Sequence, residues 1–332
     1  MSTLILIFAS ALLFAVSATP GARWLALKLG IVDEPAARKV HTTPIPRLGG
    51  IAMYGAVVIA LLVFRERFGL NQLVSILLGA TWVSLLGVVD DGWGLRPVLK
   101  LTGQVVGAVI LILAGVQVQF LSSEALNWAV TIIWVVGLTN AINFLDNMDG
   151  LSGGIAAIAS AFFLLLAVQN GQYLVGVLSA ALLGASFGFL VYNFNPASIF
   201  MGDTGSLFLG FMLAAAGIKL RFPNNDDAIT WMVPVLVLGV PIFDTTLVVF
   251  SRIRRGLHPA TPGKDHTSHR LVRMGFTQRE AVMALYLVGG MLGMVAVFVT
   301  QADLIEAYLF GVSVFLAALW GIWRMERVPL DQ

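Results

Sequence analysis

Two adjacent aspartates, Asp90 and Asp91, end an apolar run of the chain. Carboxylates at membrane depth are costly unless a partner, a metal ion or a water-filled cavity compensates them. Neighbouring negative charges also raise each other's pKa unless a cation lies between them. The candidate cations are Mg²⁺ and Lys100, which lies at the start of the next apolar run. A solvated helix end is the alternative interpretation.

A polar stripe follows where another apolar run ends. Asn140, Asn143 and Asn147 have helical spacing, and Asn143, Asp146 and Asp149 step by three. Three amides and two carboxylates are more than helix capping requires. We therefore expect this stripe to line a polar site, with hydrated asparagine caps as the alternative.

A turn-rich segment from Asn195 to Ser206 opens directly into an apolar run. Backbone N–H groups at a helix start, together with the hydroxyls of Thr204 and Ser206, are suited to phosphate oxygens. Asp203 is suited to a hard cation. A plain Asp or Ser N-cap is the alternative.

Two further segments carry cations beside these clusters. The first runs from Asp33 to Gly50, where juxtamembrane Lys and Arg often serve only topology or lipid headgroups. The second, about thirty residues from Ser251 onward, is too long for a plain turn and is expected to carry function. A zinc site is not expected at its His266 and His269, because no further ligands lie nearby in the sequence.

The elements that position these residues are predicted to be membrane-spanning helices. Of 332 residues, 58% are apolar and 11% are charged, roughly half the charged share of a soluble domain. The apolar runs predict an all-α, polytopic integral membrane protein with about eleven spans, ten being the alternative count. They lie at 4–20, 50–64, 73–89, 101–118, 125–144, 153–168, 173–191, 204–218, 228–250, 281–300 and 304–323.

Other features of composition narrow the class of protein. The first run lacks a preceding positive charge, so we expect a retained helix rather than a cleaved signal peptide. The chain has no cysteine, which excludes disulfides and thiolate ligands. Its net charge of +2 does not indicate a nucleic-acid partner. Neither related halves nor a broken helix of the kind found in transporters is recognised in the sequence.

The loops are assigned to sides by the positive-inside rule. With the N-terminus outside, only Arg65, Arg67, Lys219 and Arg221 of the 20 Lys and Arg residues face outward. This predicts a cytoplasmic C-terminus in a bacterial inner membrane. It places all the polar clusters on the cytoplasmic side, where loops 21–49, 90–100, 145–152, 192–203 and 251–280 of a single catalytic domain, 1–332, are expected to form the active site.

Taken together, these segments resemble the polyprenyl-phosphate N-acetylhexosamine-1-phosphate transferases, glycosyltransferase family 4, in the bacterial branch that primes envelope polysaccharides. The likeness runs from about Asp33 to Gly275 and rests on several motifs in the family's order. These are Arg38-Lys39-Val40-His41 with Pro46-Arg47-Leu48-Gly49-Gly50, Asp90-Asp91 with Lys100, Asn140-Ala141-Ile142-Asn143-Phe144-Leu145-Asp146, Phe200-Met201-Gly202-Asp203-Thr204-Gly205-Ser206, and Asp265-His266.

The resemblance implies transfer of a sugar-1-phosphate, with GlcNAc-1-phosphate favoured, from a UDP-N-acetylhexosamine to undecaprenyl or a related polyprenyl phosphate. UMP is released, and Mg²⁺ is required, with Mn²⁺ as a possible substitute. The product would enter lipopolysaccharide, teichoic acid or related cell-wall synthesis. Membrane lipids surround such an enzyme, and a homodimer is left open.

The resemblance also implies roles for single residues. The implied catalytic residues are Asp90, Asp91, Asp203 and His266, and the implied metal ligands are Asp203, Asp91 and Asp146. Lys39, Lys100 and His266 would meet phosphate oxygens, and Phe200 would stack on uracil. Substrate binding is implied for Lys39, Arg47, Lys100, Asn143, Asp146, Asp149, Phe200, Ser206 and His269.

Two departures from the family pattern bear on these roles. Ser268 occupies a position where a further His is common, and Asn147 occupies the place of a common Gly. Two other functions stay open at this point. A phospho-N-acetylmuramoyl-pentapeptide transferase is disfavoured because its three-His run is missing, and a secondary transporter is disfavoured because the charges gather at one face.

Overall fold

A computed structural model describes residues 2–34, 43–64, 70–222 and 225–330. The chain is helical, as predicted, apart from one two-stranded antiparallel pair of β1 (Val32–Asp33) with β2 (Ile45–Pro46) in the described residues. It divides into two compact units, Met1–Leu220 and Arg221–Gln332.

Unit 1 contains eight helices in its described residues. Its buried core consists mainly of small and aliphatic side chains, as suits helices that pack closely in a membrane. The helices are α1 (Ser2–Leu29), α2 (Gly49–Val63), α3 (Leu70–Trp93), α4 (Pro97–Leu113), α5 (Glu124–Leu145), α6 (Leu151–Gln169), α7 (Tyr173–Asn193) and α8 (Gly202–Lys219).

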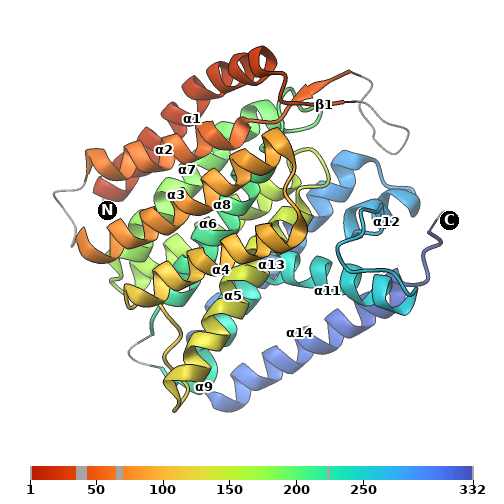
Figure 1. Cartoon of the computed structure of the whole chain (residues 1–332). Coiled ribbons are helices and arrows are strands. Elements are labelled where there is room, and N and C mark those ends of the chain that lie inside the picture. The colour runs from red at the N-terminus through yellow and green to blue at the C-terminus, as the bar shows by residue number, and fades with distance from the viewer. Residues whose placement is uncertain (1, 35–42, 65–69, 223–224, 331–332) are drawn as a thin grey trace. The chain divides into compact units, whose positions relative to one another are not determined.

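Helix α8 lies at the centre of unit 1. Almost all its residues are buried, and it contacts α3 and α5 most extensively. Figure 1 shows α8 among the other helices of this unit. The first residues of α8 are therefore held on several sides, which fixes the place where its polar N-terminus emerges.

Helices α1 and α7 pack with their backbones close together. A Cβ atom added to Gly188 of α7 would lie 2.6 Å from the carbonyl oxygen of Leu12, and one added to Gly184 would lie 3.0 Å from the Cβ of Ala11. The four-residue spacing of these glycines is the small-residue pattern of close helix pairs in membranes. Without side chains at these two positions, α1 can pack directly against the backbone of α7.

Unit 2 consists of α9 (Asp227–Thr230), α10 (Met232–Val237), α11 (Gly239–Arg254), α12 (Thr267–Arg273), α13 (Gln278–Val299) and α14 (Leu304–Met325). The expected continuous span 228–250 is wrong, because the chain bends by 77° between Val237 and Gly239. The expectation of no broken helix is therefore also wrong. Pro241 has no N–H for the carbonyl of the preceding turn, which accounts for a break in the ladder here.

The membrane-spanning character of the fold is clear, while several boundaries differ from the prediction. Seven described helices are long and apolar enough to span a membrane, or eight if the bent pair is one span. Helices α2 and α4 are apolar but shorter. Helix α1 continues to Leu29 rather than ending near Pro20, and α3 continues to Trp93, so that Asp90 and Asp91 lie within its last turn.

Candidate active site

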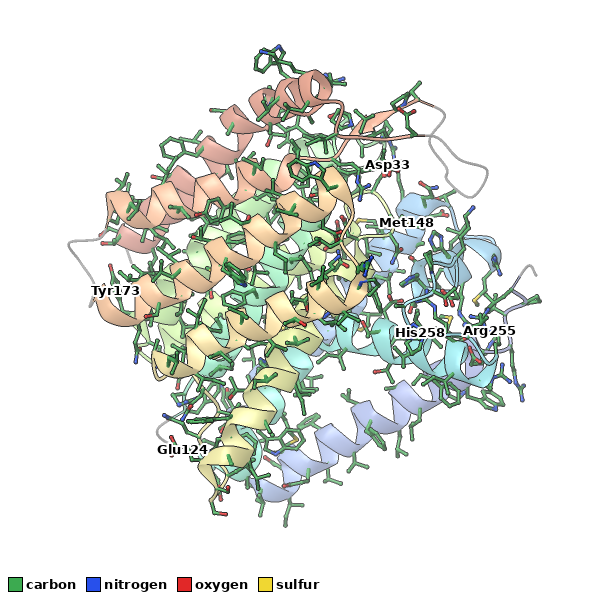
Figure 2. All side chains as sticks on the ribbon, in the orientation of Figure 1. Asp33, Glu124, Met148, Tyr173, Arg255 and His258 are labelled. Carbon is green, nitrogen blue, oxygen red and sulfur yellow. The ribbon has the colours of Figure 1, made fainter. Side chains whose placement is uncertain are left out.

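The loops of unit 1 gather at opposite ends of its helices. Figure 2 shows Asp33 and Met148 at one end and Glu124 and Tyr173 at the other. The end that carries Asp33 and Met148 also carries the ends of α3 and α5 and the start of α8. This is the end at which the aspartates and asparagines of the sequence motifs meet.

Lys100 is the centre of the polar network at this end. Its ammonium group contacts Asp203 and lies 2.8 Å from Oδ2 of Asp90. Its Nζ is also 3.4 Å from Oδ1 of Asn143. Lys100 lies near the start of α4 and Asp90 lies in the last turn of α3, so the short connection of residues 94–96 brings this pair together. The structure thus joins three predicted site residues to one cation.

Asn143 connects this network to α8. Its Nδ2 donates to Oδ1 of Asp203 and to Oγ of Ser206, both at 2.9 Å. One turn earlier in α5, Asn140 exchanges hydrogen bonds with Gln104 of α4, which is 1% exposed. The polar stripe predicted on α5 therefore extends toward the membrane interior and meets a partner, Gln104, that the sequence analysis did not identify.

Asp91 has a different environment from its neighbour Asp90. Its side chain is fully buried. It accepts from the backbone N–H groups of Asp203 and Thr204, both at 2.9 Å, and from Oγ1 of Thr204 at 2.7 Å. Arg47 lies 3.6 Å away, and also 3.6 Å from Asp33. Asp91 therefore supplies, from another helix, the acceptor that an N-cap normally provides.

The expectation that the start of α8 receives phosphate oxygens stays a prediction, and in this structure Asp91 occupies the donors concerned. The N–H groups of Asp203 and Thr204 and the Thr204 hydroxyl already donate to Asp91. Ser206 donates to the carbonyl of Gly202 at 3.0 Å. Gly202 has a φ of +67° and lies against the Asp91 carboxylate, where a side chain has neither the space nor a relaxed backbone.

Asp146 and Asp149 flank the network at the end of α5. Burial, together with the negative charges of Asp203 and Asp91, raises the pKa of Asp146 to about 8. Asp149 accepts from Nδ2 of Asn195 at 3.1 Å and from the backbone N–H of Ala197 at 2.9 Å. Asp149 thus holds the loop before α8, whereas Asp146 is mostly protonated at neutral pH unless a cation offsets the charges of its neighbouring carboxylates.

The remaining predicted residues of unit 1 are placed as follows. The backbone of Phe200 contacts the end of β2 and the start of α2: its N–H donates to the carbonyl of Pro46 at 2.8 Å, and its carbonyl accepts from the N–H of Gly49 at 2.9 Å. Its ring is partly exposed. Lys39, with the whole of the Arg38 to His41 motif, lies outside the described residues.

In unit 2, the long basic loop is organised by ion pairs. Arg252 binds Asp265 through two nitrogens, at 2.7 and 2.9 Å, and Arg255 binds the same carboxylate at 2.6 Å. Arg270 is fully buried and reaches Glu326, Ser251 and the carbonyl of Met325 at 2.6 to 2.8 Å. These arginines hold the loop in one shape.

The two predicted histidines lie at the start of α12, with ring centroids 6.2 Å apart. His266 is nearly buried, and its Nδ1 lies 2.8 Å from Oδ2 of Asp244. Burial, with the neighbouring charges of His266 and Lys264, lowers the pKa of His269 to about 4. His269 is therefore neutral at physiological pH.

Asp244 is a residue that the sequence analysis missed. It is the only acidic residue between Ala228 and Phe250, and it is 1% exposed. An ionisable residue within an apolar span is a functional candidate in its own right. That rule, applied to the ninth predicted span, would have found it.

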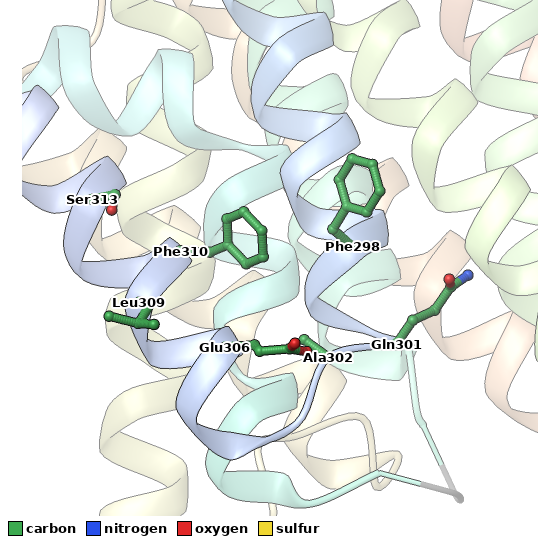
Figure 3. Close-up of a pocket in the computed structure, with 7 residues that line it drawn as sticks. All are labelled: Phe298, Gln301, Ala302, Glu306, Leu309, Phe310 and Ser313. Atoms are coloured by element: carbon green, nitrogen blue, oxygen red, sulfur yellow. The ribbon is translucent and has the colours of Figure 1, made fainter.

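A cavity of about 390 Å³ lies between α13 and α14, and unlike the polar network of unit 1 its lining is mainly apolar (Figure 3). Phe298 and Phe310 stack in it with centroids 6.3 Å apart, and its one charged residue is Glu306. An apolar cavity with a single negative charge offers nothing to a phosphate group. We therefore locate the candidate site at the carboxylate and lysine network instead.

The requirement for Mg²⁺ can be tested against this donor set. In the described residues no three acidic or imidazole groups converge as a cage made by protein alone. Mg²⁺ is usually held by one or two carboxylates with waters and substrate phosphates. Asp203, with Asp146 beside it, meets that requirement, whereas Asp91 uses both of its oxygens on α8. The residues therefore fit a substrate-completed Mg²⁺ site.

Comparison with known proteins agrees with the motifs. A family model described as Glycosyl transferase family 4 matches residues 73–221. A probable undecaprenyl-phosphate N-acetylglucosaminyl 1-phosphate transferase of Bacillus subtilis is 34% identical over 92% of this chain and 87% of its own length. A decaprenyl-phosphate N-acetylglucosaminephosphotransferase of Mycolicibacterium smegmatis is 32% identical over 86% of this chain and 79% of its own.

A more distant relative extends the likeness along nearly the whole chain. An undecaprenyl-phosphate alpha-N-acetylglucosaminyl 1-phosphate transferase of Yersinia pestis is 26% identical over 97% of this chain and 92% of its own length. The expected motifs, the helical membrane fold and these relatives agree. The chain belongs to glycosyl transferase family 4, the family of the polyprenyl-phosphate N-acetylglucosamine-1-phosphate transferases.

Proposed function

We propose that this protein transfers GlcNAc-1-phosphate from UDP-GlcNAc to undecaprenyl phosphate or a similar polyprenyl phosphate. The products are the polyprenyl-diphospho-sugar and UMP, and the reaction is a first membrane step of envelope polysaccharide synthesis. The activities named for the relatives support the lipid and the sugar. The observation that carries the proposal is the Lys100 network, which sets one cation between two carboxylates at the end of apolar helices.

The reaction brings two phosphate-bearing anions together, so positive charge has to offset their repulsion. Lys100 and Arg47 are the cations of the described part of unit 1 that lie beside the carboxylates. We propose that Lys100 moves from its carboxylate partners to the incoming phosphate oxygens. Asn143 contacts both Lys100 and Asp203, and it thereby fixes the positions of these two side chains relative to each other.

We also propose that the enzyme requires Mg²⁺, held by Asp203 and Asp146. When bound, the ion would neutralise charge on the diphosphate and on departing UMP. Asp90 is left to position the lipid phosphate once Lys100 has moved. A phosphate monoester with a second pKa of about 6 is mostly dianionic at neutral pH, so no strong base is needed. Direct attack and an aspartyl-phosphate intermediate are both compatible with these residues.

We propose that His266 acts on a phosphate in the same reaction, and that the site faces the cytoplasm of the inner membrane. The proposed topology has eleven spans with the N-terminus outside. Every predicted span overlaps a helix of the structure. In unit 1, residues predicted inside and outside lie at opposite helix ends (Figure 2).

The reaction is tested by UMP release from purified protein with undecaprenyl phosphate and Mg²⁺. The donors are UDP-GlcNAc, UDP-GalNAc and UDP-MurNAc-pentapeptide, each with and without the lipid. Lipid-dependent release with UDP-GlcNAc is the expected result. Release only with the pentapeptide donor would instead assign the enzyme to that branch, and no release from folded protein would overturn the proposal.

The topology is tested by single-cysteine labelling, since the native chain has no cysteine. Ser122→Cys and Ala260→Cys change exposed loop residues of units 1 and 2. A membrane-impermeant maleimide added to intact cells should label Cys at 122 and leave Cys at 260 unlabelled until the cells are opened. The reverse pattern would invert the proposed orientation.

A further inference from the structure

The buried Asp244 is not explained by the network of unit 1. It lies in α11, near the bend between α10 and α11, and its carboxylate contacts two groups of the α12 segment. Oδ2 lies 2.8 Å from Nδ1 of His266, and Oδ1 accepts the backbone N–H of Thr267 at 2.7 Å. Both partners belong to the start of α12, so this one carboxylate joins α11 to the segment that carries His266.

The backbone around His266 is independently fixed. Asp265 is bound by Arg252 and Arg255, and its carbonyl accepts from Nε of Arg270 at 2.9 Å. Asp265, the residue before His266, is therefore already anchored without Asp244. Holding α12 in place does not require a further buried charge, because any acceptor at Asp244 would satisfy the Thr267 N–H group.

A carboxylate does something for His266 that a neutral acceptor would not. It can only accept hydrogen bonds, so Nδ1 of His266 must donate to it. The proton is thereby placed on Nδ1, and Nε2 becomes the nitrogen that can gain or lose one. Partners of this kind set both the tautomer and the orientation of functional imidazoles.

We propose that Asp244 is a positioning residue, which orients the His266 ring and keeps its proton on Nδ1 so that Nε2 acts on a substrate phosphate. This inference rests on the proposed function. Asn in place of Asp244 has nearly the same shape and can still accept the Thr267 N–H group. Its NH₂ group, however, would donate to Nδ1 and move the imidazole proton to Nε2.

The test is a double-mutant cycle on UMP release. Asp244→Asn should lower kcat by about 100-fold, the scale of a lost acid–base group, with the donor KM changed less than about threefold. In a His266→Gln background the same change should cost less than about threefold, because the two residues act as one unit. Asp226→Asn is the matched control, since Asp226 also accepts a backbone N–H group but has no imidazole partner.

The outcomes separate the inference from the proposed function. No lipid-dependent UMP release by the unmodified protein would remove the proposed function. With release established, unchanged kcat in Asp244→Asn or in His266→Gln would overturn the inference. An equal cost of Asp244→Asn in both backgrounds would make Asp244 a structural residue only.

A measurement on the unmodified side chain covers the case in which Asp244→Asn does not fold. The chain has four histidines. In ¹⁵N-histidine-labelled protein at a pH where the imidazoles are neutral, the signal that disappears in His266→Gln should belong to an Nδ1–H tautomer. A signal from the Nε2–H tautomer would overturn the inference.

Discussion

Asp91→Asn should destabilise unit 1 more than it disturbs the chemistry directly. The change keeps the shape of the side chain, but it replaces one of the two carboxylate oxygens that meet Asp203 N–H, Thr204 N–H and the Thr204 hydroxyl. An amide NH₂ then faces at least one donor. A buried donor left without an acceptor costs about 1–3 kcal/mol, and loss of a helix cap costs about 0.5–2 kcal/mol.

These two free-energy costs describe the same lost hydrogen bonds in part, so we expect a net destabilisation of about 1–3 kcal/mol. For domains of 150–250 residues, each kcal/mol lowers the melting temperature by roughly 2–4 °C. The assay is thermal unfolding of the purified protein in detergent. Unfolding is monitored as the loss of the monodisperse peak in size-exclusion chromatography after heating. Asp91→Asn should melt several degrees below the unmodified protein.

Asp203→Asn provides the comparison, because Asp203 lies in the same turn of α8 yet its side chain faces Lys100 and Asn143. We expect it to melt within a few degrees of the unmodified protein. An Asp91→Asn protein that melts with the unmodified protein would refute the capping role. If Asp91→Asn lost all turnover but kept its melting temperature, Asp91 would instead act in the reaction itself.

Three further predictions concern activity, buried charge and pH. Asp203→Asn should abolish lipid-dependent UMP release, and normal Mg²⁺-dependent release by this variant would remove Asp203 from the metal site. Arg270→Met should destabilise unit 2 by about 3–5 kcal/mol, because it strands the partner of a buried ion pair; a melting temperature equal to that of the unmodified protein would contradict this. Burial raises the pKa of Asp265 and of Glu326, but hydrogen bonds and ion pairs with arginines outweigh it, so both pKa values lie below their usual 3.8 and 4.5. A depressed carboxyl pKa gives stability that is present above the usual value and lost as pH falls through the lower one. Melting temperature should therefore decline below about pH 4.5, and Asp265→Asn should flatten that decline; an unchanged slope would exclude Asp265 as its source.

The sequence predicted the parts of the site that depend on local pattern. Apolar runs located the helices, and the spacing of Asn140 and Asn143 correctly placed both on a polar face of α5. The association of Lys100 with Asp90 followed from their short separation. In each case the physical cause is contained in neighbouring residues.

What the sequence did not predict depends on partners far along the chain. Asp90 and Asp91 look equivalent in sequence, yet helix periodicity turns one toward Lys100 and the other toward the start of α8, more than one hundred residues later. The function of Asp244 depends on His266, across the long loop. The bend before Gly239 was missed because the apolar run continues on both sides of it, and hydropathy does not register the N–H group that Pro241 lacks.

The close packing of α1 against α7 has a consequence for the order of synthesis. The face of α1 that meets Gly184 and Gly188 is made early, whereas those glycines are translated about 170 residues later. At about 5–20 residues per second, this interval is roughly 9–35 s. During that time the small-residue face of α1 has no α7 to receive it and must be covered by lipid or by the insertion machinery. Assembly of unit 1 therefore includes a late step in which α1 meets a helix translated long after it, with only α8 of this unit still to follow.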